Sequence, residues 1–432
     1  MKVSRIEIKD FQQFKDFELD LTYPEGHPKA GQPLDKVCFI GQSGTGKTTI
    51  LRLIDTLISE TKNIYSFEEK NEVTKENLAV RLNYSSIKDN REGFCIKYRD
   101  FLDYETYYHE ITRGNLDSIE ELNHLLFFET GLENHTKLIT GVNQYSLPPV
   151  HTQGDMNQIR QKQAEIISGY NEITCINSDS YFSDEAMQFY IFQKLYTHNE
   201  LVKGVSNKLY NNALNGNIEK ILLELKAWKE HNPNPRVELS KKLENILSKF
   251  NLKIDTESTQ DYIKLKTLQD TEISIQAAST GTKQILLSAI PLAFMETQHR
   301  IILFDEPERS LFPDIQRTLI DYYVKLAHEA QFFFATHSPI IASQFEPCER
   351  FILSFDEETG FVKVRNGIAP EGDDPNDLLS KDFGMRTIMG EKGMAAWERF
   401  VELRMLIREE KNDTKKEQFA NEYLSLQRAY NF

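Results

Sequence analysis

The segment with the clearest capacity for chemistry runs from Gly41 to Thr48 and has the sequence Gly-Gln-Ser-Gly-Thr-Gly-Lys-Thr. It fits the phosphate-loop (P-loop) pattern G-x-x-x-x-G-K-[ST], in which glycines allow backbone N–H groups to close around phosphates. The lysine of this pattern neutralises phosphate charge, and the hydroxyl after it binds Mg²⁺. The pattern therefore predicts a site for a nucleoside triphosphate with Mg²⁺. The predicted binding residues are Gly41, Ser43, Gly44, Thr45, Gly46, Lys47, Thr48 and Thr49.

Two carboxylates, Asp305 and Glu306, follow the apolar run Ile301–Phe304. An aspartate at the end of such a strand reaches Mg²⁺ directly or through water. The glutamate after it is placed to polarise an attacking water as a general base. Acidic pairs at strand ends are common without any function. Because a P-loop is also present, we favour Asp305 as a metal ligand and Glu306 as a catalytic residue.

His337 follows the apolar run Phe332–Phe334 and lies in the sequence Thr-His-Ser-Pro. A histidine at a strand end can donate a hydrogen bond to the terminal phosphate and to the attacking water. Taken alone, such a histidine would be structural. Together with the P-loop and the acidic pair, His337 is predicted to be catalytic, as is Lys47.

The segment Ser279–Gln284 opens a helical run. Ser279 and Gly281 at a helix N-terminus offer a hydroxyl, free amides and a positive dipole to an anion. A helix N-cap uses the same atoms, so the structural and the anion-binding interpretations both hold. The sequence predicts that Ser279 and Gly281 contact a nucleotide.

These residues need a scaffold that brings distant segments together. Strands are predicted at 37–40, 301–304, 331–335 and 350–355, and a helix follows the P-loop at 49–58. Continuous apolar strands separated by helical stretches suit a parallel sheet covered on both faces. Alternating residues predict antiparallel strands within 3–21 and 77–98.

The predicted fold class is α/β. We expect an N-terminal lobe with the P-loop at 1–100 and an inserted helical subdomain at 101–265. A second lobe is expected at 266–360, and a tail with two helices at 361–432. A breaker, His231–Pro235, separates two helical runs of the insert.

Composition limits the classes of partner. The chain of 432 residues has a net charge of −15, which argues against a broadly basic surface for nucleic acid and leaves a local basic groove open. No apolar run approaches the ~20 residues of a membrane helix, and the N-terminus alternates like a strand rather than a signal peptide. The four cysteines are isolated. We therefore expect a cytoplasmic protein with free thiols, no zinc site and no membrane partner.

The order of these motifs resembles the ABC-type ATPase head of the SMC, RecF and OLD families. The resemblance implies a P-loop NTPase fold of ABC-head type with a mixed sheet, an antiparallel N-terminal β-subdomain, a helical insert and a helical tail. It makes Ser279 and Gly281 the signature, Asp305 and Glu306 the Walker B pair, 307–313 the D-loop and His337 the switch histidine. Thr280 and Thr282 depart from the signature of transporter heads, and Gln144 is the candidate for the Q-loop glutamine.

The same resemblance implies an ATPase with ATP and Mg²⁺ as cofactors. Two copies would sandwich two ATP molecules, as a homodimer or within a higher homo-oligomer. Ser279 and Gly281 of one copy would then face the ATP bound by Lys47 of the other. The turnover rate stays open.

At a finer level, the chain resembles the ATPase subunits of bacterial anti-phage systems such as Septu, PARIS and ATPase-bearing retrons. The segment 372–377, the residues Asp382–Gly384 and the tail from Trp397 support this resemblance. It implies a sensor or scaffold that controls a separately encoded effector, a nuclease. One alternative is a RecF-like or SMC-like repair or recombination ATPase acting directly on DNA. Another is a scaffold that binds ATP and barely hydrolyses it.

Overall fold

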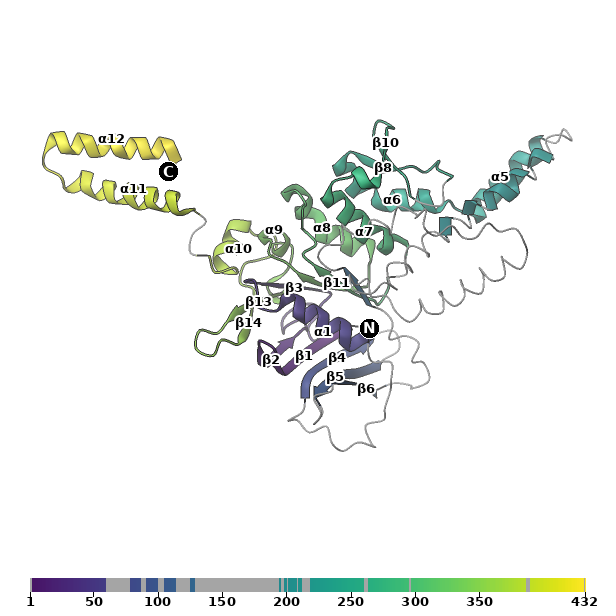
Figure 1. Cartoon of the computed structure of the whole chain (residues 1–432), viewed down its shortest axis with the longest axis horizontal. Helices are drawn as coiled ribbons and strands as arrows, with labels where there is room; N and C mark the ends of the chain where they lie inside the picture. Colours follow the sequence, from purple (N-terminus) through teal and green to yellow (C-terminus); the bar gives the residue numbers. More distant parts are fainter. Residues whose placement is uncertain are drawn as a thin grey trace. The chain divides into compact units, whose positions relative to one another are not determined.

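The computed structural model describes residues 2–59, 78–86, 91–99, 105–113, 125–128, 194–195, 198–199, 201–207, 209–211, 218–259, 263–294, 297–385, 389–430 and 432. The chain divides into two compact units, Met1–Gly372 and Asp373–Phe432 (Figure 1). Residues 129–193 of the predicted insert, among them Gln144, lie outside the described residues.

A six-stranded sheet forms the centre of the first unit, in the order β14-β13-β3-β12-β11-β7. All neighbours except the pair β13 and β14 are parallel. Every residue of β11 and β12 is buried, as their continuous apolar sequences predicted. The strands are β3 (Lys36–Gly41), β7 (Leu125–Phe128), β11 (Ile301–Asp305), β12 (Gln331–Ala335), β13 (Arg350–Phe355) and β14 (Val362–Asn366).

A five-stranded sheet of antiparallel neighbours forms a second layer, in the order β2-β1-β4-β5-β6. Its first four strands confirm the antiparallel pairs predicted at 3–21 and 77–98. The strands are β1 (Lys2–Phe11), β2 (Phe14–Asp20), β4 (Leu78–Ser86), β5 (Arg91–Arg99) and β6 (Glu105–Arg113).

Strands β6 and β7 lie within 101–265, the stretch that the sequence assigned to a helical insert. Each extends one of the two sheets at its edge. Strand preference depends on the neighbours that a strand packs against, so the sequence of these two segments did not by itself separate them from the predicted insert. The sheets of the first unit therefore take residues from beyond the predicted lobe boundary at 100.

Helix α1 (Lys47–Ser59) packs against both sheets. Its buried face includes Ile50, Ile54 and Leu57, in one cluster with Ile6 of β1 and Phe39 of β3. This spacing of apolar residues is the helical pattern seen in the sequence. The packing fixes the start of α1, and with it the P-loop.

The remaining elements of the first unit include the helices that follow β11 and β12. The predicted breaker is confirmed, because α5 ends at His231 and the side chain of Asn234 caps α6, accepting from the Arg236 N–H at 2.9 Å. A small three-stranded sheet has the order β10-β9-β8. The helices are α5 (Ile218–His231), α6 (Pro235–Leu247), α7 (Thr280–Phe294), α8 (Pro313–Leu326) and α9 (Pro339–Ala342). The strands are β8 (Leu252–Ile254), β9 (Leu265–Thr267) and β10 (Glu272–Ile273), and the 3₁₀ turns are η4 (Ser248–Phe250), η5 (Ile275–Ala277) and η6 (Pro347–Glu349).

The second unit contains α10 (Pro375–Lys381), α11 (Glu391–Glu409) and α12 (Asp413–Tyr430), which confirms the two tail helices. Phe400 of α11 stacks on Tyr423 of α12 with ring centroids 4.2 Å apart. The unit begins at Asp373 rather than at the predicted 361, because β14 pairs with β13 in the first unit. Within the described ranges, no helix combines the length and apolar character needed to cross a membrane.

The predicted α/β class is therefore confirmed, with the P-loop between a parallel strand and the helix that covers the sheet.

Candidate active site

The candidate site lies at the carboxyl edge of the six-stranded sheet. Strands β3, β12 and β11 are parallel neighbours, with Phe39 opposite Ala335 and Ala335 opposite Asp305. Their carboxyl ends therefore meet at one edge. The P-loop, the acidic pair and His337 follow these strand ends, as the sequence predicted.

The P-loop has a shape that only glycine permits at two positions. Gly46 has φ +87°, and a Cβ there would lie 2.3 Å from Gln13 Nε2 and 2.4 Å from Phe14 Cζ. A Cβ on Gly41 would lie 2.3 Å from the carbonyl oxygen of Leu353. The buried Thr45 donates from its hydroxyl to the Gln42 carbonyl at 2.7 Å. Ser43 and Gly44 are exposed on this loop, whereas Thr49 lies in the first turn of α1. The loop is thus a preformed cradle at a helix N-terminus, where free amides attract phosphate.

Lys47 is the buried cation of the site, only 6% exposed. Its Nζ donates to the carbonyls of Gly41 at 2.9 Å and Gln42 at 3.1 Å. Burial lowers the pKa of Lys47, and the charges of Asp305, Glu306 and Glu308 oppose that shift. Neutral carbonyls hold the ammonium more weakly than phosphate oxygens would, because a phosphate adds the attraction of an opposite charge.

Thr48 and Asp305 come together from segments far apart in the chain. The Thr48 hydroxyl lies 3.1 Å and 3.0 Å from the two carboxylate oxygens of Asp305. Both side chains present hard oxygen donors, which Mg²⁺ prefers. Mg²⁺ commonly uses one or two protein oxygens and takes its other ligands from water and phosphate. The donor set therefore fits the predicted Mg²⁺ site.

Glu306 and His337 face each other at the open side of the site. Glu306 Oε1 lies 3.8 Å from His337 Nε2, and their side chains are 36% and 43% exposed. Glu306 has φ +49°, a conformation that non-glycine residues rarely adopt. Its N–H is held by the Ala335 carbonyl at 2.8 Å. Partial burial and the Lys47 charge lower the pKa of His337, whereas Glu306 raises it. The imidazole is therefore neutral near pH 7 and can both donate and accept.

Ser279 is exposed at the start of α7, and Gly281 is buried one residue into the helix. The Ser279 hydroxyl accepts the Thr282 N–H at 3.2 Å and lies 2.7 Å from Thr282 Oγ1, which makes Ser279 the N-cap. A Cβ on Gly281 would lie 2.4 Å from the Ser310 carbonyl oxygen. The first turn of α7 therefore packs on the loop that follows Glu306. The nucleotide contact of Ser279 and Gly281 stays a prediction.

Glu308 has a role at this edge that the sequence reasoning did not assign. Its carboxylate accepts from the Thr336 hydroxyl at 2.6 Å and from the His337 N–H at 3.1 Å. Burial raises the pKa of Glu308. Glu308 thus ties the loop after β11 to the loop that bears His337. The available signal was its position three residues after Asp305, in a loop that must lie beside the end of β12.

A family model described as an AAA ATPase domain matches residues 1–342. The search of curated proteins returned no match.

Among solved structures, the chain is similar to an SMC head domain from Thermotoga maritima, with 12% identity, a TM-score of 0.41, and coverage of 85% of this chain and 100% of that one. It is also similar to an SMC head bound to the C-winged helix domain of ScpA, with 13% identity, a TM-score of 0.45, and coverage of 85% and 97%. A third is an SMC head with an extended coiled coil bound to the C-terminal domain of ScpA, derived from Pyrococcus furiosus. It has 13% identity, a TM-score of 0.44, and coverage of 84% and 96%.

Proposed function

We propose that this chain, which belongs to the AAA ATPase domain family, binds MgATP at the carboxyl edge of its six-stranded sheet and hydrolyses it with Glu306 and His337. The observation that supports this most directly is the 3.0 Å contact between Thr48, in the first turn of α1, and Asp305, the last residue of β11. This pair offers hydroxyl and carboxylate oxygens beside the buried ammonium of Lys47.

The residues divide the reaction between them. The P-loop amides and Lys47 hold the phosphates, with Nζ exchanging its bonds to the carbonyls of Gly41 and Gln42 for phosphate oxygens. Thr48 and Asp305 would hold Mg²⁺, which would supply positive charge beside the phosphate oxygens. Glu306 takes the proton of the attacking water, and the neutral His337 donates a hydrogen bond to the transferred phosphate.

ATP-dependent pairing of two copies is the second part of the proposal. Its support is the exposed Ser279 at the N-terminus of α7, packed beside the loop after Glu306. There its hydroxyl and the helix dipole are available to a phosphate that another copy holds. Each site would then combine Lys47 of one copy with Ser279 and Gly281 of the other.

Pairing can be tested in the Glu306→Gln background, where slow hydrolysis keeps ATP bound. Light scattering should show a dimer with MgATP and a monomer without it. Adding Ser279→Lys should leave ATP binding intact and keep the chain monomeric, because a bulky cation replaces the small hydroxyl. Ser206→Lys, at another exposed serine, is the matched control and should still dimerise. A dimer of unchanged stability with Ser279→Lys would contradict pairing through α7.

The cellular role that we propose is a cytoplasmic sensor or scaffold in a bacterial anti-phage system. ATP-dependent pairing would control a separately encoded effector, a nuclease. Support comes from the resemblance of segment 372–377 and the tail to such ATPases. The second compact unit, Asp373–Phe432, also gives an effector a body distinct from the ATPase unit to dock on.

Purifying the chain with the products of its neighbouring genes tests this role. A nuclease that co-elutes and is released or activated when ATP is hydrolysed is the expected result. Repair or replication proteins that co-elute, together with an ATPase rate stimulated by DNA ends, would instead establish the RecF-like alternative. The net charge of −15 counts weakly against that outcome.

A further inference from the structure

An exposed aromatic ring lies beside the P-loop and has no part in the chemistry described so far. Phe355 ends β13, the parallel neighbour of β3, and Leu353 is opposite Gly41 in that pair. Its side chain is 39% exposed, although the other aromatic residue of β13, Phe351, is buried. The ring atom Cζ of Phe355 lies 3.8 Å from the position that a Cβ on Gly44 would occupy.

The sheet order shows which way a bound nucleotide must extend. Asp305, Glu306 and His337 follow β11 and β12, on one side of β3. The terminal phosphate must lie on that side, because the groups that act on it are there. A triphosphate that extends along this edge of the sheet would place its nucleoside toward the opposite neighbour of β3. That neighbour is β13, which ends in Phe355.

The turn between β1 and β2 closes the same region. The Gln13 amide donates to the Gly44 carbonyl at 3.4 Å, and the Gln13 carbonyl accepts from the Val362 N–H at 2.9 Å. Lys15 Nζ lies 5.3 Å from the centroid of the Phe361 ring. These contacts hold the β13–β14 hairpin against the turn, and they fix the backbone that presents Phe355.

We propose that Phe355 is the stacking surface for the purine base of the bound nucleotide. The inference rests on the proposed function, since it assumes that phosphates bind in the P-loop. Every base has a π-face, so stacking on an aromatic ring adds affinity with little demand on hydrogen bonding. A purine covers more of the ring than a pyrimidine. Phe355 would therefore favour purine over pyrimidine triphosphates, with the phosphates bound independently of the ring.

Calorimetric titration of the full chain separates the contribution of the base to binding affinity from that of the phosphates. The ligands are the Mg²⁺ complexes of a non-hydrolysable ATP analogue, of the matching CTP analogue and of inorganic tripolyphosphate. Phe355→Ala and Phe355→Leu should each raise Kd for the ATP analogue about tenfold, as expected for the loss of one stacked base, and leave Kd for tripolyphosphate within about twofold. Phe355→Trp should bind the ATP analogue at least as tightly as the parent chain.

The preference for the ATP analogue over the CTP analogue should shrink in Phe355→Leu. Tyr210→Ala, which removes an exposed ring elsewhere, is the control and should change no Kd. An unchanged Kd for the ATP analogue in Phe355→Ala and Phe355→Leu would overturn the proposal. Equal losses for the analogue and for tripolyphosphate would also overturn it, since they would show that the ring supports the P-loop. If instead the parent chain binds none of the ligands, the proposed function itself fails.

Discussion

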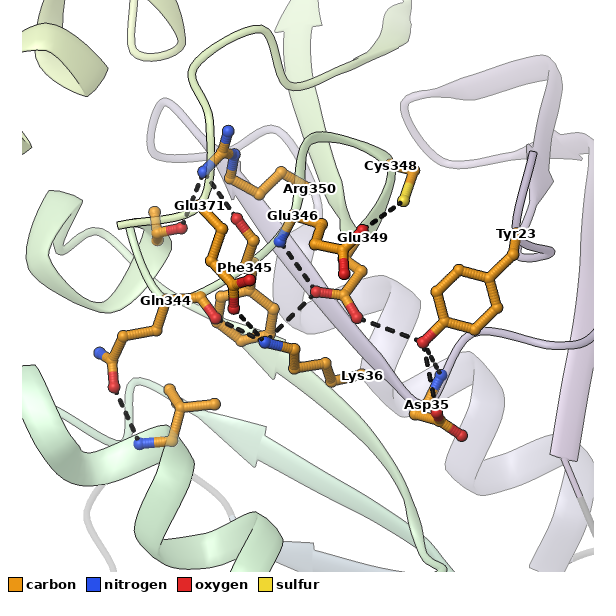
Figure 2. A network of polar contacts seen from close by, with 12 residues as sticks. Tyr23, Asp35, Lys36, Gln344, Phe345, Glu346, Cys348, Glu349, Arg350 and Glu371 are labelled. Carbon is orange, nitrogen blue, oxygen red and sulfur yellow. Dashed lines mark hydrogen bonds and ion pairs between the residues drawn. The ribbon is translucent and has the colours of Figure 1, made fainter. Parts of the chain in front are cut away.

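The two ends of the six-stranded sheet both collect charged side chains, and they differ in how those charges are satisfied. At the amino end, Lys36 of β3 lies 3.4 Å from Glu349 and 2.9 Å from Glu371, and donates to the Gln344 carbonyl at 2.6 Å (Figure 2). The Tyr23 hydroxyl links Glu349 to Asp35 in the same network. At the carboxyl end, Glu306 and His337 are 3.8 Å apart and partly open to solvent.

The difference separates a structural cluster from the proposed nucleotide site. The amino-end side chains are paired with one another, and these contacts hold η6 and the loop before β3 in place. At the carboxyl end, the buried ammonium of Lys47 is hydrogen-bonded to neutral carbonyls, and the nearby acids lie at loop ends. A bound phosphate can exchange for those carbonyls. A charged side chain that is hydrogen-bonded only to neutral groups is therefore a better guide to a ligand site than a high density of charges.

The largest expected effect is on catalysis at the carboxyl end. Glu306→Gln should lower the rate of ATP hydrolysis about a thousandfold, because the amide cannot accept the proton of water. ATP binding should remain within about threefold of the parent. Steady-state ATPase assays and equilibrium titrations measure the two quantities. An unchanged rate would show that Glu306 is not the general base.

Lys47→Ala should raise Kd for MgATP about 100-fold, because it removes a charge-assisted contact with the phosphates. The matched variant at the other end of the sheet is Lys36→Met. It should leave Kd unchanged and lower the free energy of unfolding by about 1 kcal/mol, because Glu349 loses the cation that partly offsets its burial. Calorimetric titration and denaturant unfolding of both variants test the contrast. Loss of ATP binding in Lys36→Met would contradict this contrast between the two ends of the sheet.

The pH dependence of stability tests the burial of Glu349 in the amino-end cluster. Burial raises the pKa of Glu349 from 4.5 to about 7, and Lys36 beside it only partly opposes the shift. A raised folded-state pKa contributes stability that is complete below pH 4.5 and is lost as pH rises toward 7. Between pH 5 and pH 8, the parent should therefore lose about 2–3 kcal/mol of unfolding free energy relative to Glu349→Gln. Parallel unfolding curves across this range would contradict the assignment.

The smallest effect is expected at Glu308, which accepts two hydrogen bonds beside His337 at the carboxyl end. Glu308→Gln retains an oxygen for Thr336 and the His337 N–H, and should lower the ATPase rate only about twofold. Glu308→Ala should lower it about tenfold by releasing the loop that bears His337, with Kd for MgATP little changed. The split between rate and Kd is the informative readout. If Glu308→Ala weakened MgATP binding by the same factor as it lowered the ATPase rate, the loops as a whole would have been disrupted.

Several features could be predicted from sequence because their causes are local. The P-loop needs glycines at fixed spacing, and Gly41, Gly44 and Gly46 all have positive φ. The buried strands β11 and β12 follow from continuous apolar residues, and the breaker at 231–235 follows from proline chemistry. The type and position of these elements were therefore readable without any partner segment.

Tertiary structure alone decided which residues meet. Thr48 bonds Asp305 across 257 positions, and Glu308 bonds Thr336 across 28, because parallel pairing places the ends of β3, β11 and β12 at one edge. Strands β6 and β7 each pair with the edge of a sheet, which local sequence did not reveal. Phe355 became notable only when its register placed it beside Gly44. Backbone preferences act over a few residues, whereas contacts between loops depend on the order and register of strands, which no local pattern encodes.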